Sequence, residues 1–303
     1  MHVVMKILVT GANGFLGKSI VRELIDSCKI KSLSRTAGDY RVALENEIPH
    51  FNQTFDLVIH TAGKAHSVPK TEAEKKQFHD INVLGTQNLL KGLQKEGVPQ
   101  QFVFISSVAV YGQESGLGID EGHRLDAKDA YGVSKIEAER LVQEWCKQHN
   151  VVCTILRLPL LVGKDAPGNL GAMIKAITKG YYFNIGGGKA KKSMVLARDV
   201  ASAIMKVAPV GGIYNLTDGL HPDFNELSLA IATNKNKRKP SNLPMTAALF
   251  IGKIGDLLGG KAPIDSLKIK KMISDLTFDD TKAKITFDWK PQSVVEYINN
   301  NKI

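Results

Sequence analysis

The sequence predicts an α/β fold, in which a doubly wound parallel sheet is joined to a smaller carboxyl-terminal α/β lobe. In the first half, short β-branched runs alternate with longer helical patterns, as they do in repeated strand–helix–strand units. Most of the short runs are continuously apolar, which is typical of parallel strands buried on both faces. With 303 residues, of which 43% are hydrophobic, the chain is long enough to bury a large core.

The expected elements follow one another along the chain. Strands are predicted over residues 3–9, 30–33, 55–60, 101–106, 151–156 and 213–216, and helices over 15–26, 71–96, 130–148 and 197–207. After Gly163 the elements become shorter, and from Pro222 onward the pattern predicts small helices joined by basic loops. We therefore expect one domain from residues 1–165 with about 193–217, and a smaller lobe from about 166–192 with 218–303.

A glycine-rich turn follows the first strand and opens the first helix. Its sequence is Thr10-Gly11-Ala12-Asn13-Gly14-Phe15-Leu16-Gly17. Glycines at this spacing permit a tight turn and let the backbone approach a pyrophosphate, which the first amides of the helix then bind. The alternative is an ordinary turn, but the position between an apolar strand and a helix favours a Rossmann-type dinucleotide site. The candidate cofactor contacts are Gly11, Asn13, Gly14, Phe15, Leu16 and Gly17.

The end of the second strand indicates which dinucleotide is preferred. A carboxylate at this point would accept hydrogen bonds from the ribose 2′-hydroxyl and select NAD. This chain has Ser34 and Arg35 instead, and a guanidinium can pair with a 2′-phosphate. The sequence therefore favours NADP over NAD as cofactor. A solvated Arg35 is the alternative, and the neighbouring Asp39 keeps NAD open.

A serine, a tyrosine and a lysine form the candidate catalytic group. Ser106 and Ser107 end the strand at 101–106, and Tyr131 and Lys135 lie four residues apart at the start of the next helix, on one helical face. A free tyrosine has a pKa near about 10, and an ammonium at about 4–6 Å stabilises the phenolate enough to lower that pKa substantially. Ser107 would then orient the substrate oxygen. The alternative is that Tyr131 only packs while Lys135 is solvated.

Further motifs accompany this group. They are His60-Thr61-Ala62-Gly63, Asn82-Val83-Leu84-Gly85-Thr86, Tyr111-Gly112, Leu156-Arg157-Leu158-Pro159 and Phe287-Asp288-Trp289-Lys290-Pro291. With them, nearly the whole chain resembles an extended short-chain dehydrogenase/reductase of the nucleotide-sugar epimerase/dehydratase group. The resemblance implies that Ser106, Ala62, Gly63, Lys64, Asn82 and Pro159 lie around the cofactor, and that Asn169, Leu170 and Lys192 bind the substrate. No metal ligand is implied.

The resemblance also implies a reaction, which is hydride transfer at C4 of a nucleotide-linked sugar, with UDP as the expected nucleotide. Both 4-keto reduction and 4-epimerisation stay open. Leu160 stands where many UDP-glucose 4-epimerases carry an asparagine, and Val108-Ala109 replaces the acidic pair that dehydratases usually carry. The alternatives are a reductase of a carbonyl that is not on a sugar nucleotide, and a non-catalytic dinucleotide sensor.

Composition and charge bear on partners and compartment. The chain carries 40 Lys and Arg against 30 Asp and Glu, a net charge of +10, with dense basic runs at 235–239 and 268–271. A phosphorylated substrate or a solvated lysine face explains this charge better than nucleic acid, because no nucleic-acid-binding motif accompanies it. The apolar stretch 243–258 is shorter than a membrane span and contains Lys253 and Asp256. Three scattered cysteines and no visible signal peptide favour the cytoplasm, and the resemblance implies a possible homodimer.

Overall fold

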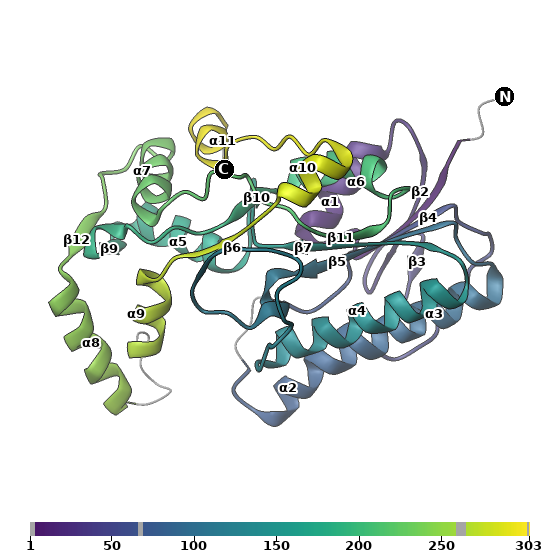
Figure 1. Ribbon diagram of the computed structural model, residues 1–303, viewed down its shortest axis with the longest axis horizontal. Coiled ribbons are helices and arrows are strands. Elements are labelled where there is room, and N and C mark those ends of the chain that lie inside the picture. The colour runs from purple at the N-terminus through teal and green to yellow at the C-terminus, as the bar shows by residue number, and fades with distance from the viewer. Residues whose placement is uncertain (1–3, 66–68, 259–264, 302) are drawn as a thin grey trace.

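The computed structural model describes residues 4–65, 69–258, 265–301 and 303, and it contains a seven-stranded parallel sheet (Figure 1). The strand order is β11-β7-β5-β4-β1-β2-β3, and every neighbouring pair is parallel. The order reverses between β1 and β4, which is where open α/β sheets bind ligands at the carboxyl ends of their strands. The strands are β1 (Lys6–Thr10), β2 (Lys29–Ser34), β3 (Tyr40–Arg41), β4 (Leu57–His60), β5 (Gln101–Ser107), β7 (Val152–Leu158) and β11 (Gly212–Asn215).

Helices cover both faces of this sheet, as the sequence predicts. α1 (Phe15–Leu24) and α6 (Ala197–Val207) share one apolar core with the sheet, and α3 (Gly85–Glu96) and α4 (Ala130–Gln148) share the other. Figure 1 shows the first pair above the sheet and the second pair below it. The predicted doubly wound α/β fold is confirmed, and the helices at 130–148 and 197–207 have the predicted bounds. The first strand begins at Lys6, and the predicted start at residue 3 lies outside the described residues.

The helix predicted over 71–96 is interrupted in the structure. α2 (Glu72–His79), which begins with Thr71 and Glu74 in a capping box, leads into a π-helical turn at Asp80–Leu84 and then into α3. Such turns are rare and are frequently found at functional sites. This one contains Asn82, whose side chain is buried.

The remaining elements form short paired strands and small helices beyond the carboxyl edge of the sheet. Parallel pairs join β8 to β10, β9 to β12, and β6 to β13. No helix among the described residues is long and apolar enough to cross a bilayer. The bounds are β6 (Gly116–Ile119), β8 (Leu160–Val162), α5 (Gly168–Lys179), β9 (Phe183–Ile185), β10 (Met194–Leu196), α7 (Phe224–Asn234), β12 (Ser241–Leu243), α8 (Met245–Leu258), α9 (Ser266–Ile273), β13 (Leu276–Phe278), α10 (Thr281–Phe287) and α11 (Val294–Asn300).

A buried ion pair holds α4 against the sheet. Glu139 of α4 accepts hydrogen bonds from Nε and Nη2 of Arg157 on β7, at 3.1 and 2.7 Å. The two side chains are 0% and 3% exposed. Ser106 of β5 donates to the same carboxylate at 2.5 Å. Three elements therefore meet at one carboxylate.

Hydrogen bonds continue from this pair toward the carboxyl-terminal elements. Nη1 of Arg157 donates to the hydroxyl of Tyr111 at 3.1 Å, and that hydroxyl donates to Oδ1 of Asn215 at 2.8 Å. The Asn215 amide in turn donates to the carbonyls of Ile119 and Asp279. The buried network thus links α4 and the sheet to the end of β6 and to the residue that follows its partner strand β13.

We expect Glu139→Gln to lower the free energy of unfolding by about 3 kcal/mol, because it leaves the Arg157 guanidinium buried without a counter-charge. Urea denaturation measures the loss. The control is Asp126→Asn, which breaks the exposed pair with Lys128 and should leave the stability nearly unchanged, because solvent screens such a pair. Equal small losses in both variants would contradict the role of the buried pair.

Candidate functional site

The glycine-rich turn between β1 and α1 forms an open cradle for an anion. Gly11 has a φ of +66°, and a Cβ atom there would lie 2.7 Å from the Ala62 amide nitrogen. A Cβ at Gly17 would lie 2.2 Å from the Gly11 carbonyl oxygen, so glycine is required for α1 to pack this closely. Gly14 is the N-cap of α1, and no described side chain caps the helix. The first amides of α1 therefore fit a pyrophosphate.

The loop after β2 lies beside this cradle. Asn13 donates through Nδ2 to the Ser34 hydroxyl at 2.7 Å and to the Ala37 carbonyl at 3.0 Å. Arg35 is 64% exposed and makes only a 3.4 Å contact with Glu45. Its guanidinium is thus free to reach a ligand.

The carboxylate of Asp39 is engaged elsewhere. It accepts hydrogen bonds from the Ser32 amide and hydroxyl and from Nζ of Lys31. Partial burial acts to raise the pKa of Asp39, but these hydrogen bonds and the Lys31 charge hold it at about 2. Asp39 is therefore an ionised partner of the β2 residues.

Asn82 joins the loop after β4 to the start of α4. Its Oδ1 accepts the Lys64 amide at 2.6 Å, and its Nδ2 donates to the Lys64 carbonyl at 3.1 Å and to the Ser134 hydroxyl at 2.8 Å. Ser134 donates to the Tyr131 carbonyl at 2.7 Å. Ala62 and Gly63 lie in the loop that Asn82 holds, and the Ala62 amide also donates to the Thr10 hydroxyl. The predicted cofactor contacts of this loop are thus fixed relative to Tyr131.

His60 is buried near the same edge of the sheet and stabilises it by hydrogen bonds. Its ring nitrogens lie 2.6 Å from the Thr10 hydroxyl and 2.9 Å from the Thr86 hydroxyl. Complete burial, and next the charge of Lys135, lower the pKa of His60 to about 3. The imidazole is therefore neutral and joins β1, β4 and α3 by hydrogen bonds.

Ser107, Tyr131 and Lys135 come together at the carboxyl end of β5. Asp129 caps α4 by accepting the amides of Tyr131 and Gly132, so the helix begins beside this strand end. The Tyr131 phenol faces the Ser107 hydroxyl, and this interaction acts to lower the pKa of the phenol. The Lys135 ammonium donates to the Ile105 carbonyl at 2.7 Å and lies 4.1 Å from the centre of the Phe104 ring.

Burial dominates the protonation of this group. It raises the pKa of the Tyr131 phenol, while the hydrogen bond with Ser107 acts to lower it and the Asp129 charge acts to raise it. Burial also lowers the pKa of Lys135 to about 8, against the opposing effect of Glu139. The sequence argument expects a lowered pKa for Tyr131. The pKa of Tyr131 is raised instead because desolvation of the phenol outweighs the other effects. The Lys135 ammonium also donates its hydrogen bond to the Ile105 carbonyl and not to the phenol.

The remaining predicted site residues differ in whether their side chain or only their backbone is available to a ligand. The Ser106 side chain faces Glu139 in the buried layer and not the open edge. Leu16 and Leu170 place their side chains in apolar cores, so only their backbone is available. Pro159 directly follows β7 and is half-buried, and Asn169 is exposed in the first turn of α5.

Lys192 lies on a different element, in the segment before β10, where it forms a bridge with Leu276 of β13. Burial lowers the pKa of Lys192, with Asp275 opposing and Lys271 reinforcing that effect. Its half-buried ammonium fits an anionic ligand better than a free surface position would. No described group of three or more His, Cys, Asp or Glu side chains is placed to hold a metal ion.

Two supporting residues escape prediction from the sequence. Glu139 lies four residues after Lys135 on the same helical face. The only local sign of its role is that this acidic residue repeats the four-residue interval between Tyr131 and Lys135. Ser134 lies within the Tyr131-to-Lys135 motif, but its link to Asn82 depends on the fold. Both lie in the buried layer under the candidate catalytic residues and help to hold the helix that carries them.

The sequence matches the family described as "NAD dependent epimerase/dehydratase family" over residues 7–216. It is 30% identical over 300 residues to the N-acetyl-alpha-D-glucosaminyl-diphospho-ditrans,octacis-undecaprenol 4-epimerase of Escherichia coli O157:H7, covering 91% of this chain and 88% of the relative. It is 27% identical to the UDP-glucose 4-epimerase of Vibrio cholerae, covering 96% and 92%.

Among solved structures, RMD from Pseudomonas aeruginosa complexed with NADPH aligns with a TM-score of 0.73, at 23% identity and covering 98% of this chain and 97% of that one. At this identity the likeness shows the fold alone. The family match extends over more than half of the sequence and includes the glycine-rich turn, Ser107, Tyr131 and Lys135. The chain belongs to the NAD dependent epimerase/dehydratase family.

Proposed function

We propose that this protein is an NAD(P)-dependent enzyme that transfers a hydride at C4 of a sugar linked to a nucleoside diphosphate, with UDP as the nucleotide. It either reduces a 4-keto group or inverts the configuration at C4. The carrying observation is that the Tyr131 phenol meets Ser107 at the carboxyl end of β5, one helical turn from Lys135 and at the same edge of the sheet as the open amides of α1. The curated relatives support the substrate class, since both act on a sugar attached through a diphosphate.

The residues divide the chemistry between them. The coenzyme, when bound, supplies or accepts the hydride at the sugar carbon. Tyr131 gives a proton to the C4 oxygen when the keto sugar is reduced, and takes it back from the hydroxyl when the alcohol is oxidised. The raised pKa of Tyr131 leaves the phenol protonated at neutral pH, which is the form that donates.

The neighbouring groups orient this transfer. The Ser107 hydroxyl holds the reacting oxygen and the phenol together. Lys135, fixed by the Ile105 carbonyl, directs its remaining donors to the nicotinamide ribose. Below a pH of about 8 its charge also favours ionisation of Tyr131 when the base is needed.

We assign the substrate to the elements beyond the sheet edge. In this proposal residues 1–165 with about 193–217 bind the coenzyme, and about 166–192 with 218–303 bind the sugar nucleotide. Asn169 and the Leu170 backbone, at the start of α5, contact the nucleotide. Lys192 supplies a single positive charge to the diphosphate, without the two-pronged geometry of an arginine.

We propose NADP as the preferred coenzyme. Arg35 is mostly exposed and weakly paired, whereas Asp39 is held by Lys31 and Ser32. A free guanidinium at the end of β2 suits a 2′-phosphate, while the engaged carboxylate is a poor partner for a 2′-hydroxyl.

We expect Tyr131→Phe to reduce kcat by at least about 100-fold, because general acid–base groups typically contribute about 10²–10⁴-fold. Turnover of UDP-linked 4-keto and 4-hydroxy sugars measures this, and circular dichroism confirms the fold. The control is Tyr181→Phe, which removes an exposed phenol on another element. Near-normal kcat in Tyr131→Phe would remove Tyr131 from the proposed role.

Arg35→Ala should weaken NADPH binding by about tenfold and leave NADH binding nearly unchanged, since only NADPH carries the phosphate that the guanidinium would pair with. Titration of coenzyme fluorescence measures both affinities. Arg140→Ala, on the exposed side of α4, is the matched loss of charge. Equal weakening of NADPH and NADH in Arg35→Ala would return Arg35 to a solvated surface role.

Coenzyme binding should weaken as the pH rises through about 8. The pKa of Lys135 in the folded protein lies below its ordinary value, so the amine is charged below about 8 and neutral above it. Fluorescence titrations with NADPH between pH 7 and 9.5 test this. Lys135→Met should lack the loss of affinity near pH 8. The same pH dependence in both proteins would assign it to another group.

A further inference from the structure

Helix α8 carries its large apolar side chains on the outside. Phe250, Ile254 and Leu257 are spaced at i, i+4 and i+7, so they form one stripe along the helix. They are 66%, 42% and 88% exposed. We call these three residues the α8 stripe. Leu249 and Ile251 on its two sides are also exposed.

The opposite side of α8 carries mostly small residues after Met245, which packs against a buried apolar cluster. Ala248, Gly252 and Gly255 repeat the same spacing and are buried. A Cβ atom at Gly252 would lie 2.7 Å from Cδ1 of Ile269, so the small residue lets α9 pack directly against the helix. This reverses the usual polarity of a surface helix, whose large apolar residues face the core.

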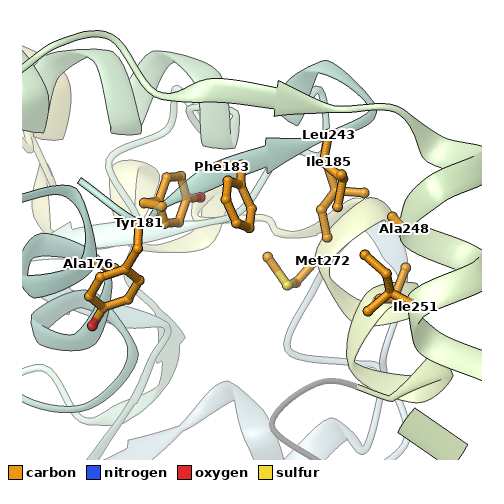
Figure 2. A pocket seen from close by; sticks show the side chains of 10 residues that line it. Ala176, Tyr181, Phe183, Ile185, Leu243, Ala248, Ile251 and Met272 are labelled. Carbon is orange, nitrogen blue, oxygen red and sulfur yellow. The ribbon is translucent and has the colours of Figure 1, made fainter. Parts of the chain in front are cut away.

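An apolar cavity of about 220 Å³ lies beside α8. Figure 2 shows Phe183, Met272 and Ile251 around it, from β9, α9 and α8. Tyr181 and Phe183 at its wall are themselves 55% and 45% exposed. Exposed apolar side chains therefore lie beside this cavity as well as on the α8 stripe, which is more than a single exposed side chain.

Cations surround this apolar surface. Lys253 lies next to the α8 stripe on the helix, Lys270 lies on α9, and Lys237, Arg238 and Lys239 lie in the loop before β12; all five are exposed. Within the described ranges, none of these five makes an ion pair, whereas Lys268 and Lys271 on α9 do. Asp256 is an exposed acidic residue on α8, so the region combines exposed apolar residues with an excess of positive charge.

We infer that the exposed face of α8, together with the loop at 237–239, docks on an anionic lipid bilayer. The α8 stripe would enter the boundary between headgroups and acyl chains, and the cations would contact the headgroups, as in helices that lie in the membrane interface. A second copy of the chain is a poorer partner. Twofold pairing through the stripe would bring the two Lys253 side chains toward each other.

This face is connected through α9 to the proposed site, and this step of the inference rests on the proposed function. Lys271 of α9 pairs at 3.1 Å with Glu114, three residues beyond the turn that Ser107 begins. Lys192, assigned to the diphosphate, bridges to Leu276, three residues after α9. Docking of α8 would hold α9, which packs against it, and with α9 the proposed sugar-nucleotide site, near the bilayer surface.

Co-sedimentation with vesicles tests the inference. At low salt the full chain should sediment with vesicles of equal parts phosphatidylglycerol and phosphatidylcholine, and stay in solution with phosphatidylcholine alone. The double variant Phe250→Ser/Leu257→Ser should bind the anionic vesicles at least about tenfold more weakly, because it removes two large apolar contacts. Lys253→Glu should also weaken binding. Ile285→Ser, which changes an 81% exposed residue on α10, is the matched control and should bind normally.

The opposing outcomes are distinct. Absence of vesicle binding by the natural chain, or equal binding by the double variant and Ile285→Ser, would overturn the inference. Light scattering that shows a dimer, lost in the double variant, without vesicle binding would assign the face to a second copy and would also overturn it. Circular dichroism checks that the variants fold. Vesicle binding needs no turnover, and the double variant should turn over a water-soluble UDP-sugar normally, so failure here leaves the proposed function separately testable.

Discussion

The placement of the candidate catalytic residues depends on the buried ion pair between Glu139 and Arg157. Glu139 lies on α4 two turns beyond Tyr131, and its carboxylate is held by two guanidinium nitrogens from β7 and by the Ser106 hydroxyl from β5. Each buried charge would cost several kcal/mol if unpaired, so the pair tolerates little movement of the helix along the sheet. The position of the Tyr131 phenol is thus determined by the buried contacts that α4 makes with β5 and β7.

Exclusion of water also determines the charge state of the site. It makes His60 neutral, keeps Tyr131 protonated and brings the pKa of Lys135 to about 8. These groups lie within hydrogen-bond contact of the strand ends, where the effective dielectric constant is low. A charge that arrives with a ligand therefore has a larger effect on them than it would have in water. The protein holds a neutral phenol near an amine that is close to losing its proton, and both can respond to a bound coenzyme.

Local signals in the sequence predict the fold and most of the site. The glycine spacing from Gly11 to Gly17 requires a close strand–helix contact, and the helix that carries Tyr131 has its predicted bounds because Asp129 caps it. Ser106 illustrates what local signals miss. Successive side chains of a strand point to opposite faces, so Ser106 and Ser107 cannot both line one site, and the sequence alone does not tell which one does.

Contacts between distant segments account for the other differences. Glu139 and Arg157 lie on separate elements, and their pairing follows from how α4 crosses β7. The apolar character of 243–258 is plain in the sequence, but periodicity cannot show that the small residues of α8 face inward. The direction of the pKa of Tyr131 likewise depends on how deeply the phenol is packed, which no spacing reveals.

The π-helical turn at Asp80–Leu84 has a consequence for how this part of the chain can vary in length. A π turn holds one residue more than the α-helical turn it replaces. Deleting one residue between α2 and α3 would let regular α-helix run through this turn without rotating α2 relative to α3, and it would remove the local bulge that contains Asn82. The bulge thus carries the side chain that now joins Lys64 to Ser134. A single-residue deletion at this turn is therefore expected to change the site locally, through Asn82, while leaving the long helix on either side in place.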